Sequence, residues 1–405
     1  MLTFKVALRN VFRQKRRTLL TVLTMLGGFC LASISLGMSD GTYNRIIDMF
    51  TRNQLGHIQI HGQGYLDRPS LYNTVTDFEV VGESLDSIPQ VIAWAPRVFA
   101  AGLGSVGEKT TAVRLIGVDP ERETATTRLD KKLVEGRLLD SRQPYTTVLG
   151  KGLAEVLKAG LGDTLVVVSQ GADGSIANDA YEIIGLLETG DAINDQSAVY
   201  LSLEDAHDLL VLYGRVHEIA VVIEDIDEVV ELSGQMNSTL AARDLDVAPW
   251  QEFAATFYTA MQADRKGNWI MLGIIVTIVS VGVLNTVLMT VLERTREYGV
   301  LRAIGVRPFQ VMRLVVYEVG VMATMAMIIG GLLGSGINYW LSFYGIPFPE
   351  PMTYGGIEFT HYHAELTPGS IFIPAITVFL SAMLVSLFPA AKAAKISPAK
   401  AMRSN

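Results

Sequence analysis

The stretch TLLTVLTMLGGFCLASISLGMS, residues 18–39, contains no charged residue and decides the fold class. A helix of this length would be about 33 Å long, which is enough to cross a hydrocarbon core of roughly 30 Å. Three further runs are equally apolar, apart from Glu318 near the start of the second: residues 267–292, 314–341 and 366–391. The sequence therefore predicts an α-helical membrane protein with four transmembrane helices.

Charged residues orient these spans. Residues 1–17, 293–313 and 392–405 together hold 15 basic and two acidic residues, whereas residues 40–266 hold 18 basic and 35 acidic residues. Because short basic segments stay in the cytoplasm, we expect these three segments, and both termini, on the cytoplasmic side. Residues 40–266 and the loop 342–365 are then expected outside.

The outer segment reads as a mixed α/β domain. Since the only cysteine, Cys30, lies in the first span, this domain must be held together by an ordinary core. Helices are expected from Ser202 to Gly214 and over 227–243, and residues 251–266 are expected to continue as a helix into the second span. Alternating apolar residues predict strands at 113–118, 165–168, 181–184 and 219–223, with a turn at 170–180.

Two patterns that suggest chemistry do not hold up. GLGSVGEKT, residues 102–110, looks like a phosphate-binding loop, but Glu108 stands where lysine must follow glycine and a strand follows, so we predict a hairpin. His57 and His61 alternate along a strand and would lie about 13 Å apart, too far for one metal ion. We expect no catalytic residue and no metal site.

Polar and small residues inside the spans are interpreted as helix-packing contacts. Asn285 lies deep in the second span and is expected to bond to a neighbouring helix. Gly330 and Gly334 form a small-xxx-small pair that allows close helix packing, within the chain or between two subunits. Glu318 is placed within reach of the cytoplasmic interface.

Two of the basic segments, residues 1–17 and 293–313, carry further patterns. Residues 1–17 are predicted to form an amphipathic helix on the inner leaflet, with its apolar face made of Phe4, Leu8, Val11 and Phe12. The loop 293–313 mixes apolar and charged residues, as a helix seated in a partner's groove requires. A simple topological anchor is the alternative, but it would need only arginines. The predicted docking residues, with Glu297, Leu301 and Arg302 central, are Glu293, Arg294, Arg296, Glu297, Leu301, Arg302, Ile304 and Gly305.

Three segments, taken in order, resemble the FtsX-like and MacB-like permeases of ABC transporters, which include the macrolide exporter, the cell-division protein FtsX and the lipoprotein-releasing permeases. They are ALRNVFRQKRRTLLTVLTMLGG (7–28), ERTREYGVLRAIGVRPFQVMRLVVYE (293–318) and SLFPAAKAAKISPAKAMR (386–403). Outer segments such as GHIQIHGQGYLD (56–67) and VRLIGVDP (113–120) look most like the lipoprotein-releasing, LolC/LolE-type branch. Unlike that branch, the turn at 169–180 is short and lacks prolines and aromatics.

The resemblance implies a protein of the bacterial inner membrane whose outer region is a MacB-like periplasmic core domain. It implies a permease subunit that is not itself an enzyme and binds no cofactor, because a separate ATPase dimer binds ATP and magnesium and docks on loop 293–313. A second permease, alike or different, membrane lipid and a periplasmic carrier or adaptor are the other implied partners, with no nucleic acid. The implied function is mechanotransmission that moves a lipoprotein or another amphiphile from the outer leaflet. Drug or toxin efflux with an adaptor, and regulation of a cell-wall hydrolase, are the alternatives.

Overall fold

The computed structural model describes residues 2–240, 243–354 and 357–397, which form two compact units. The helical unit takes its residues from 1–44, 261–349 and 361–405, and the outer unit from 45–260 and 350–360. The end of the predicted cytoplasmic tail, residues 398–405, lies outside the described residues.

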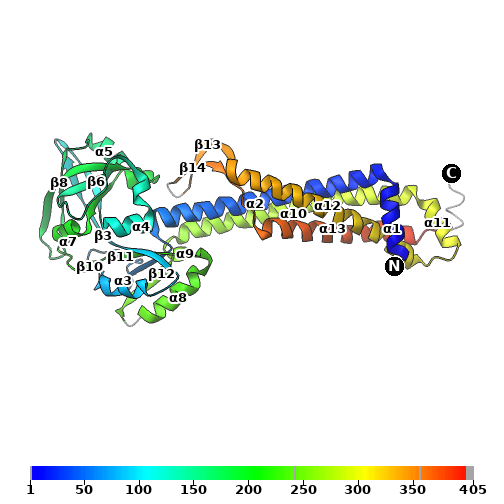
Figure 1. Ribbon diagram of the computed structural model, residues 1–405, viewed down its shortest axis with the longest axis horizontal. Helices are drawn as coiled ribbons and strands as arrows, with labels where there is room; N and C mark the ends of the chain where they lie inside the picture. The colour runs from blue at the N-terminus through cyan, green and yellow to red at the C-terminus, as the bar shows by residue number, and fades with distance from the viewer. Residues whose placement is uncertain (1, 241–242, 355–356, 398–405) are drawn as a thin grey trace. The chain divides into compact units, whose positions relative to one another are not determined.

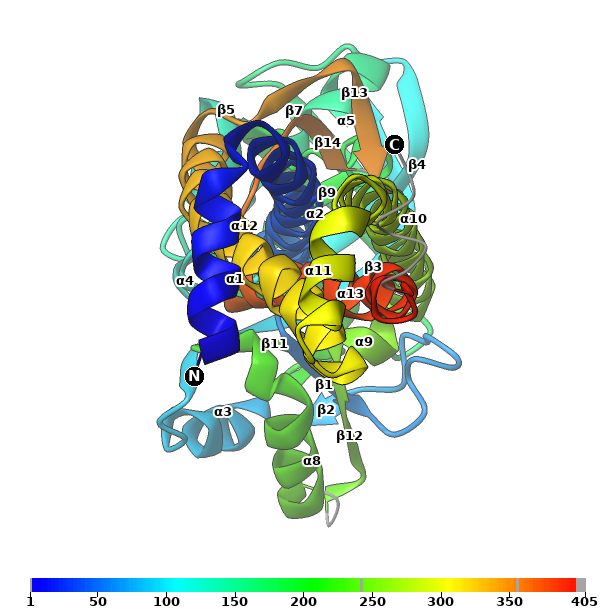
Figure 2. The same ribbon diagram turned by 90° about the vertical axis from the view of Figure 1, so that its right-hand side faces the viewer.

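Long apolar helices run side by side in the helical unit (Figure 1). Four of them are long and apolar enough to cross a membrane: α2 (Lys15–Phe50), α10 (Ala255–Glu293), α12 (Pro308–Tyr344) and α13 (Pro368–Ala394). Each contains one of the predicted spans, except for the first two residues of the last run. Two short helices, α1 (Leu2–Arg13) and α11 (Thr295–Ala303), lie at the same end of this unit, where α1 crosses α12 (Figure 2).

Small residues bring α12 close to α2. A Cβ atom added at Gly330 would lie 2.9 Å from the ring of Phe29, and one added at Gly334 would lie 3.0 Å from the hydroxyl of Ser33. One turn further on, the buried Asn338 amide donates to the carbonyl oxygen of Ser33 at 3.1 Å. Larger side chains at the two glycines would push the helices apart, so this seam needs small residues.

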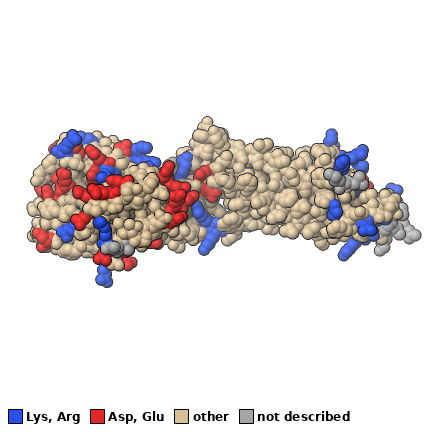
Figure 3. All heavy atoms as spheres, turned by 60° about the horizontal axis from the view of Figure 1, so that its bottom comes forward, with Lys and Arg blue, Asp and Glu red and all other residues tan. Residues whose placement is uncertain are grey.

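Charge is distributed along the helical unit as a membrane requires. On the face shown in Figure 3, a broad band of this unit carries no Lys, Arg, Asp or Glu, and blue Lys and Arg side chains gather at one of its ends. Charged side chains are excluded from a hydrocarbon core and collect at its borders.

The outer unit is built on one mixed sheet, in which ten strands are described. Its order is β12-β1-β11-β3-β4-β9-β6-β8-β5, and β7 pairs with both β3 and β8. The pairs β4–β9 and β6–β8 are parallel and the others antiparallel. The strands are β1 (Ile58–Gly62), β3 (Val91–Val106), β4 (Lys109–Val118), β5 (Leu133–Gly136), β6 (Thr146–Gly150), β7 (Thr164–Gln170), β8 (Ile176–Leu187), β9 (Ala198–Ser202), β11 (Glu218–Ile223) and β12 (Leu245–Pro249).

Short helices connect and cover these strands. They are α3 (Phe78–Asp86), α4 (Pro120–Thr127), α5 (Lys151–Leu157), α6 (Ala192–Asp195), α7 (Leu203–Leu210), α8 (Val229–Leu240) and α9 (Trp250–Phe253), with single turns at Thr51–Leu55, Leu129–Lys132 and Ile226–Glu228. Two small pairs, β2 (Val75–Thr76) with β10 (Arg215–Val216) and β13 (Ile346–Tyr354) with β14 (Ile357–Tyr362), complete the described strands.

The predicted strands and the predicted helix after Ser202 occur where the sequence places them in the outer domain, but some of their ends differ from the prediction. The four predicted strands fall within β4, β7, β8 and β11, and the glycine-rich stretch is the β3–β4 hairpin, which turns at Gly107 with φ +55°. The predicted turn at 170–180 is too long, since Gln170 already pairs with Ile176. The helix that begins after Ser202 ends at Leu210 rather than Gly214, because Val211 adopts a left-handed conformation.

A buried ion cluster joins the sheet to α4. The Arg97 guanidinium on β3 donates to Glu123 on α4 and to Glu218 on β11, each at 2.7 Å. Burial alone would lower the pKa of Arg97, but these two carboxylates outweigh it and raise that pKa. A buried charge needs such partners, so the cluster fixes how α4 sits on the sheet.

Candidate functional site: a polar joint between helices

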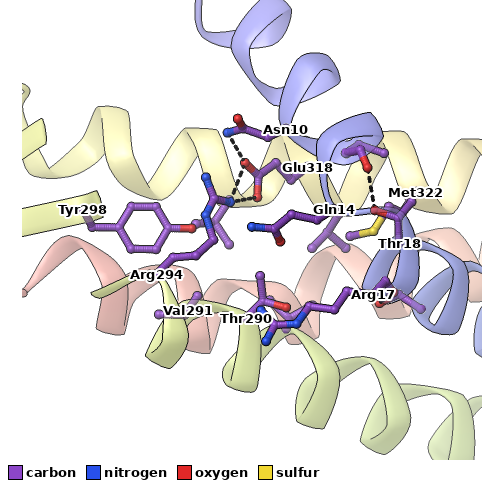
Figure 4. A pocket seen from close by; sticks show the side chains of 15 residues that line it. Asn10, Gln14, Arg17, Thr18, Thr290, Val291, Arg294, Tyr298, Glu318 and Met322 are labelled. Carbon is purple, nitrogen blue, oxygen red and sulfur yellow. Dashed lines mark hydrogen bonds and ion pairs between the residues drawn. The ribbon is translucent and has the colours of Figure 1, made fainter. Parts of the chain in front are cut away.

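Charged and polar side chains from five helical segments meet at the end of the helical unit that holds α1 and α11 (Figure 4). We call this cluster the polar joint. Its members are Asn10, Arg13, Arg17, Glu293, Arg294, Glu297, Tyr298 and Glu318.

The centre of the polar joint is a buried ion pair. One terminal nitrogen of Arg294, Nη1, lies 3.0 Å from both carboxylate oxygens of Glu318, and each residue is only 7% exposed. Arg294 also donates through Nε to Glu297 at 2.8 Å. Because Arg294 lies between α10 and α11 and Glu318 lies on α12, the pair ties the ends of three helices together.

The N-terminal helices are bound to the same centre. The side-chain amide of Asn10 on α1 donates to Glu318 at 2.7 Å, so Glu318 accepts from two different helical segments. Arg13 donates to Glu297 at 3.3 Å, and Arg17 pairs with Glu293. The ring of Phe4 contacts the edge of Tyr317 on α12, with ring centroids 6.1 Å apart. A displacement of α11 would therefore act directly on α1 and α12, and on α2 through the end of α10.

A fully buried tyrosine lies beside the ion pair. Tyr298 on α11 stacks under the Arg294 guanidinium, 5.2 Å from the ring centroid, and its hydroxyl has no hydrogen-bond partner among the described residues. Burial, together with the nearby Glu318 carboxylate, raises the pKa of Tyr298, so the phenol stays protonated. The neighbouring cavity of about 30 Å³ has room for one water molecule among these polar groups.

Five of the eight predicted docking residues contact other parts of their own chain. Glu293, Arg294 and Glu297 form ion pairs with other helices of the unit, as described above. Leu301 is half-buried and packs against the helical core, and Arg302 donates to the carbonyl oxygen of Val306 at 3.2 Å. Leu301 and Arg302 are partly buried against their own chain, and Glu297 is exposed but ion-paired, so the expectation that these three form the centre of a docking surface stays a prediction.

The outer side of α11 carries different residues. Arg296, Val300 and Ile304 recur at intervals of four and are all exposed, Ile304 by 74%. The helix ends at Ala303, and Gly305 follows with φ +96°, a conformation that favours glycine. Phe309 beyond it is 65% exposed. We call this set the outer α11 surface: Arg296, Val300, Ile304, Gly305 and Phe309.

The structure places Asn285 on the outside of the helical unit. It is exposed on α10 and makes no hydrogen bond to another helix within the described residues. The buried side of α10 is formed by a different row of residues, such as Val279, Val283 and Val287, so the expected bond of Asn285 to a neighbouring helix stays a prediction.

Sequence reasoning missed Asn10, Arg13, Arg17 and Tyr298 as members of the site. The sequence did contain a signal for the Arg294–Glu318 pair, because an acid inside a membrane span usually pairs with a nearby base. Glu318 is the only acid in the four runs, and Arg294 closely follows the end of the second run.

His57, just before β1, and His61, within it, each have hydrogen-bond partners in the protein. His57 accepts from the backbone N–H of Ile223 at 3.1 Å, and His61 contacts the carbonyl oxygen of His217 and the side chain of Gln59. No group of three or more metal-binding side chains occurs in the part of the chain that the structure describes.

Membrane-length helices attached to a mixed α/β domain define the class: a membrane protein with a large extracytoplasmic domain. Comparison with protein families makes this specific. Residues 18–239 match the family described as MacB-like periplasmic core domain, and residues 269–398 match FtsX-like permease C-terminal. The chain belongs to this family and is an ABC transporter permease, and its outer domain is a periplasmic domain.

Curated relatives are similar along the whole chain. The lipoprotein-releasing system transmembrane protein LolC of Neisseria meningitidis is 22% identical over 98% of both chains. The LolE protein of the corresponding system in Haemophilus influenzae is 21% identical over 82% of both. The macrolide export ATP-binding/permease protein MacB of Marinobacter nauticus is 22% identical over 99% of this chain, which spans only 60% of that protein.

Among solved structures, the periplasmic region of MacB from Actinobacillus actinomycetemcomitans is similar to this chain. It is 19% identical, covers 50% of this chain and 94% of its own, and has a TM-score of 0.38.

Proposed function

We propose that this chain is the permease subunit of an ABC transporter that carries motion from a separate cytoplasmic ATPase to its periplasmic domain. The polar joint is the single observation that carries this proposal. It binds α11, whose outer surface is exposed and partly apolar, to α1, α2, α10 and α12. A force applied to the outer α11 surface would reach all of the membrane-length helices that this joint contacts.

In this proposal the ATPase seats on the outer α11 surface. Val300, Ile304 and Phe309 supply apolar anchors and Arg296 supplies a charge, a combination that suits binding hot spots. In this proposal the separate ATPase, and not this chain, binds ATP and magnesium. The exposed row Phe4, Leu8 and Phe12 on α1 rests in the inner leaflet, while Val11 and Ala7 face the core.

The cargo in this proposal is a lipoprotein or another amphiphile taken from the outer leaflet of the inner membrane. Two points support an amphiphile: the described spans carry almost no ionisable groups away from the polar joint, and two of the three relatives named above, LolC and LolE, belong to lipoprotein-releasing systems. Lipid contact would come from apolar side chains near the outer ends of the spans, such as Ile270, which is 68% exposed.

Efflux of amphiphilic drugs or toxins is the second candidate, and one observation favours it. The β7–β8 hairpin closes after Gln170↔Ile176, leaving only residues 171–175 as its tip, which is small for recruiting a periplasmic carrier. Similarity to the MacB protein covers nearly the whole chain.

A photoreactive amino acid at Ile270 separates the two candidates. Irradiation in cells should join the chain to a lipoprotein, and depletion of the chain should leave lipoproteins in the inner membrane. If lipoproteins were sorted correctly after depletion while sensitivity to amphiphilic antibiotics rose, efflux would replace lipoprotein release as the function.

A further inference from the structure

The polar joint contains a buried hydroxyl group that its contacts do not explain. The Tyr298 side chain is 0% exposed, and its hydroxyl has no hydrogen-bond partner among the described residues. Buried polar groups nearly always have partners, because a group that has lost its water and gained nothing in return is costly. A phenylalanine ring would pack against Arg294 equally well, so packing does not account for the hydroxyl.

The hydroxyl borders a small cavity that Glu318 also lines. In Figure 4 it points toward the Arg294–Glu318 pair. The cavity, of about 30 Å³, has room for one water molecule, which would satisfy the hydroxyl while α11 is in the position described here. The same space is large enough for the hydroxyl oxygen itself. A movement of about 3 Å, one water diameter, would therefore bring this oxygen to the polar atoms on the other side of the cavity.

The Glu318 carboxylate has room for one more donor. Its Oε1 oxygen accepts from Asn10 at 2.7 Å and from Arg294 at 3.0 Å, whereas Oε2 accepts only from Arg294, at 3.0 Å, within the described part of the chain. Because a carboxylate oxygen has two lone pairs, Oε2 can accept a second hydrogen bond. A phenol is a suitable donor, since a hydrogen bond to an ionised acceptor is stronger than one between neutral groups.

The α11 helix is built to move as a short rigid segment. Arg294, which separates it from α10, has φ −95° and ψ 14°, outside the usual helical values, and Gly305 follows it with φ +96°. Because the backbone is interrupted at both ends, α11 can tilt without bending α10 or α12. Tyr298 lies on the covered side of α11, whereas Val300 and Ile304 are exposed. Pressure on the exposed side would therefore move the Tyr298 hydroxyl inward.

We infer that Tyr298 is a positioning residue with two arrangements. In the open arrangement, described here, its hydroxyl borders the cavity. In the closed arrangement α11 has moved inward, and the hydroxyl fills the cavity and donates to Oε2 of Glu318. Asn10 and Arg294 keep their bonds to Glu318, so the new bond adds a direct link between α11 and α12. This inference rests on the proposed function for the source of the pressure, an ATPase seated on the outer α11 surface.

Tyr298→Phe removes the hydroxyl and leaves the ring. It should weaken binding of the ATPase to the chain in nanodiscs about tenfold, because the bound state alone then lacks a hydrogen bond to a charged group. The side chain is fully buried and touches no partner itself. The unfolding temperature of the chain alone should not fall, since the hydroxyl has no protein partner in the open arrangement. Tyr317→Phe, which keeps its ring contacts with Phe4 and Arg313, is the matched control and should change neither quantity.

Fluorine NMR reports the position of the hydroxyl directly. A tyrosine analogue with fluorine next to the hydroxyl, incorporated at position 298, keeps the donor and should therefore retain ATPase binding. Its fluorine signal should shift when the ATPase is added, because the hydroxyl exchanges the cavity for the Glu318 carboxylate. The same label at position 317 is the control and should not shift.

The outcomes separate this inference from the proposed function. Suppose that Ile304→Asp, on the outer α11 surface, weakens ATPase binding. Full binding by Tyr298→Phe, an unshifted label at position 298 with the ATPase bound, or a lower unfolding temperature of Tyr298→Phe alone would then each overturn the closed arrangement and leave the proposed function standing. If Ile304→Asp instead bound the ATPase as well as the parent chain does, the docking surface would be wrong, and the proposed function and this inference would fail together.

Discussion

Arg294 and Glu318 lie on different helical segments, 24 residues apart in sequence, yet Arg294 Nη1 is 3.0 Å from both oxygens of the Glu318 carboxylate. Both side chains are buried, so the charge of each residue is compensated by the opposite charge of the other. The pair is therefore a structural requirement as well as a mechanical link between α11 and the spans.

Removing one partner of this pair should destabilise the chain more than removing both. Glu318→Leu leaves the buried Arg294 charge with only the exposed Glu297 as a partner, a change that should cost up to about 3–5 kcal/mol, whereas the double variant Arg294→Met with Glu318→Leu should cost much less. Thermal unfolding in detergent micelles measures the difference. The exposed pair Arg13–Glu297 is the control, and breaking it with Arg13→Met should cost about 0–1 kcal/mol. A double variant as unstable as the worse single one would contradict this account.

Ile304→Asp should weaken binding of the ATPase at least about tenfold without unfolding the chain, since it places a charge on the exposed outer α11 surface. Co-purification of the ATPase from membranes provides the measurement. Ile193→Asp, an equally exposed apolar position in the outer unit, is the matched control and should have no effect. If Ile304→Asp retained full ATPase binding and full coupling of hydrolysis to transport, this surface would not be the docking site.

Gly330→Ala should destabilise the helical unit relative to Gly331→Ala. The added methyl group at Gly330 lies 2.9 Å from the buried ring of Phe29, whereas Gly331 faces open space. Both changes raise helix propensity by about 1 kcal/mol, so comparing the two isolates the packing cost. Unfolding temperatures that are equal for the two variants would show that the seam between α2 and α12 tolerates a larger residue.

Acid should destabilise the outer unit through His57. Burial, reinforced by the Arg52 guanidinium, lowers the pKa of His57 to about 4. Its value in an unfolded chain is about 6.5, so the unfolded state binds more protons between these values and stability falls as the pH drops from about 6.5 to 4. This slope is at most about 1.4 kcal/mol per pH unit. His57→Asn, which does not titrate, should unfold with a weaker dependence on pH over this window. Parallel pH profiles for the two proteins would rule out this contribution.

The orientation in the membrane can be tested with single thiols in the Cys30→Ala background. Ser175→Cys, exposed on the β7–β8 hairpin, should react with an impermeant maleimide in cells with a permeabilised outer membrane. Gln310→Cys, exposed at the start of α12, should react only after the inner membrane is broken. The reverse pattern would require the opposite topology.

Much of the fold could be predicted because its signals are local. A run without charges specifies a membrane-length helix, and alternation over Val113–Val118 specifies a strand, whatever the rest of the chain does. Ser202 begins α7 because its hydroxyl accepts from the backbone N–H of Asp205 three residues on. Such features depend on neighbours within one or two turns.

The polar joint was harder to predict because its contacts join residues that are distant in sequence. In addition, α11 has apolar residues on two sides. Leu301 lies in α11, and Ile304 is the residue that directly follows this helix. Both are apolar, and nothing in the sequence says which of them packs against the core. Asn285 posed the same difficulty, since the covered face of α10 depends on where the other helices lie. The partner of Glu318 on α1, Asn10, is 308 residues away and leaves no local pattern.

The 308-residue separation between Asn10 and Glu318 also determines when these two side chains can meet during synthesis of the chain. The ribosome adds Glu318 to the chain 308 residues after Asn10, which takes roughly 15 to 60 s at usual rates of synthesis. During this interval the inner face of α1, with Ala7 and Val11, has no α12 to cover it. The first helix of the nascent chain must therefore be held by lipid or by the insertion machinery until the first turns of α12 are made, and the polar joint can close while α13 is still to be synthesised.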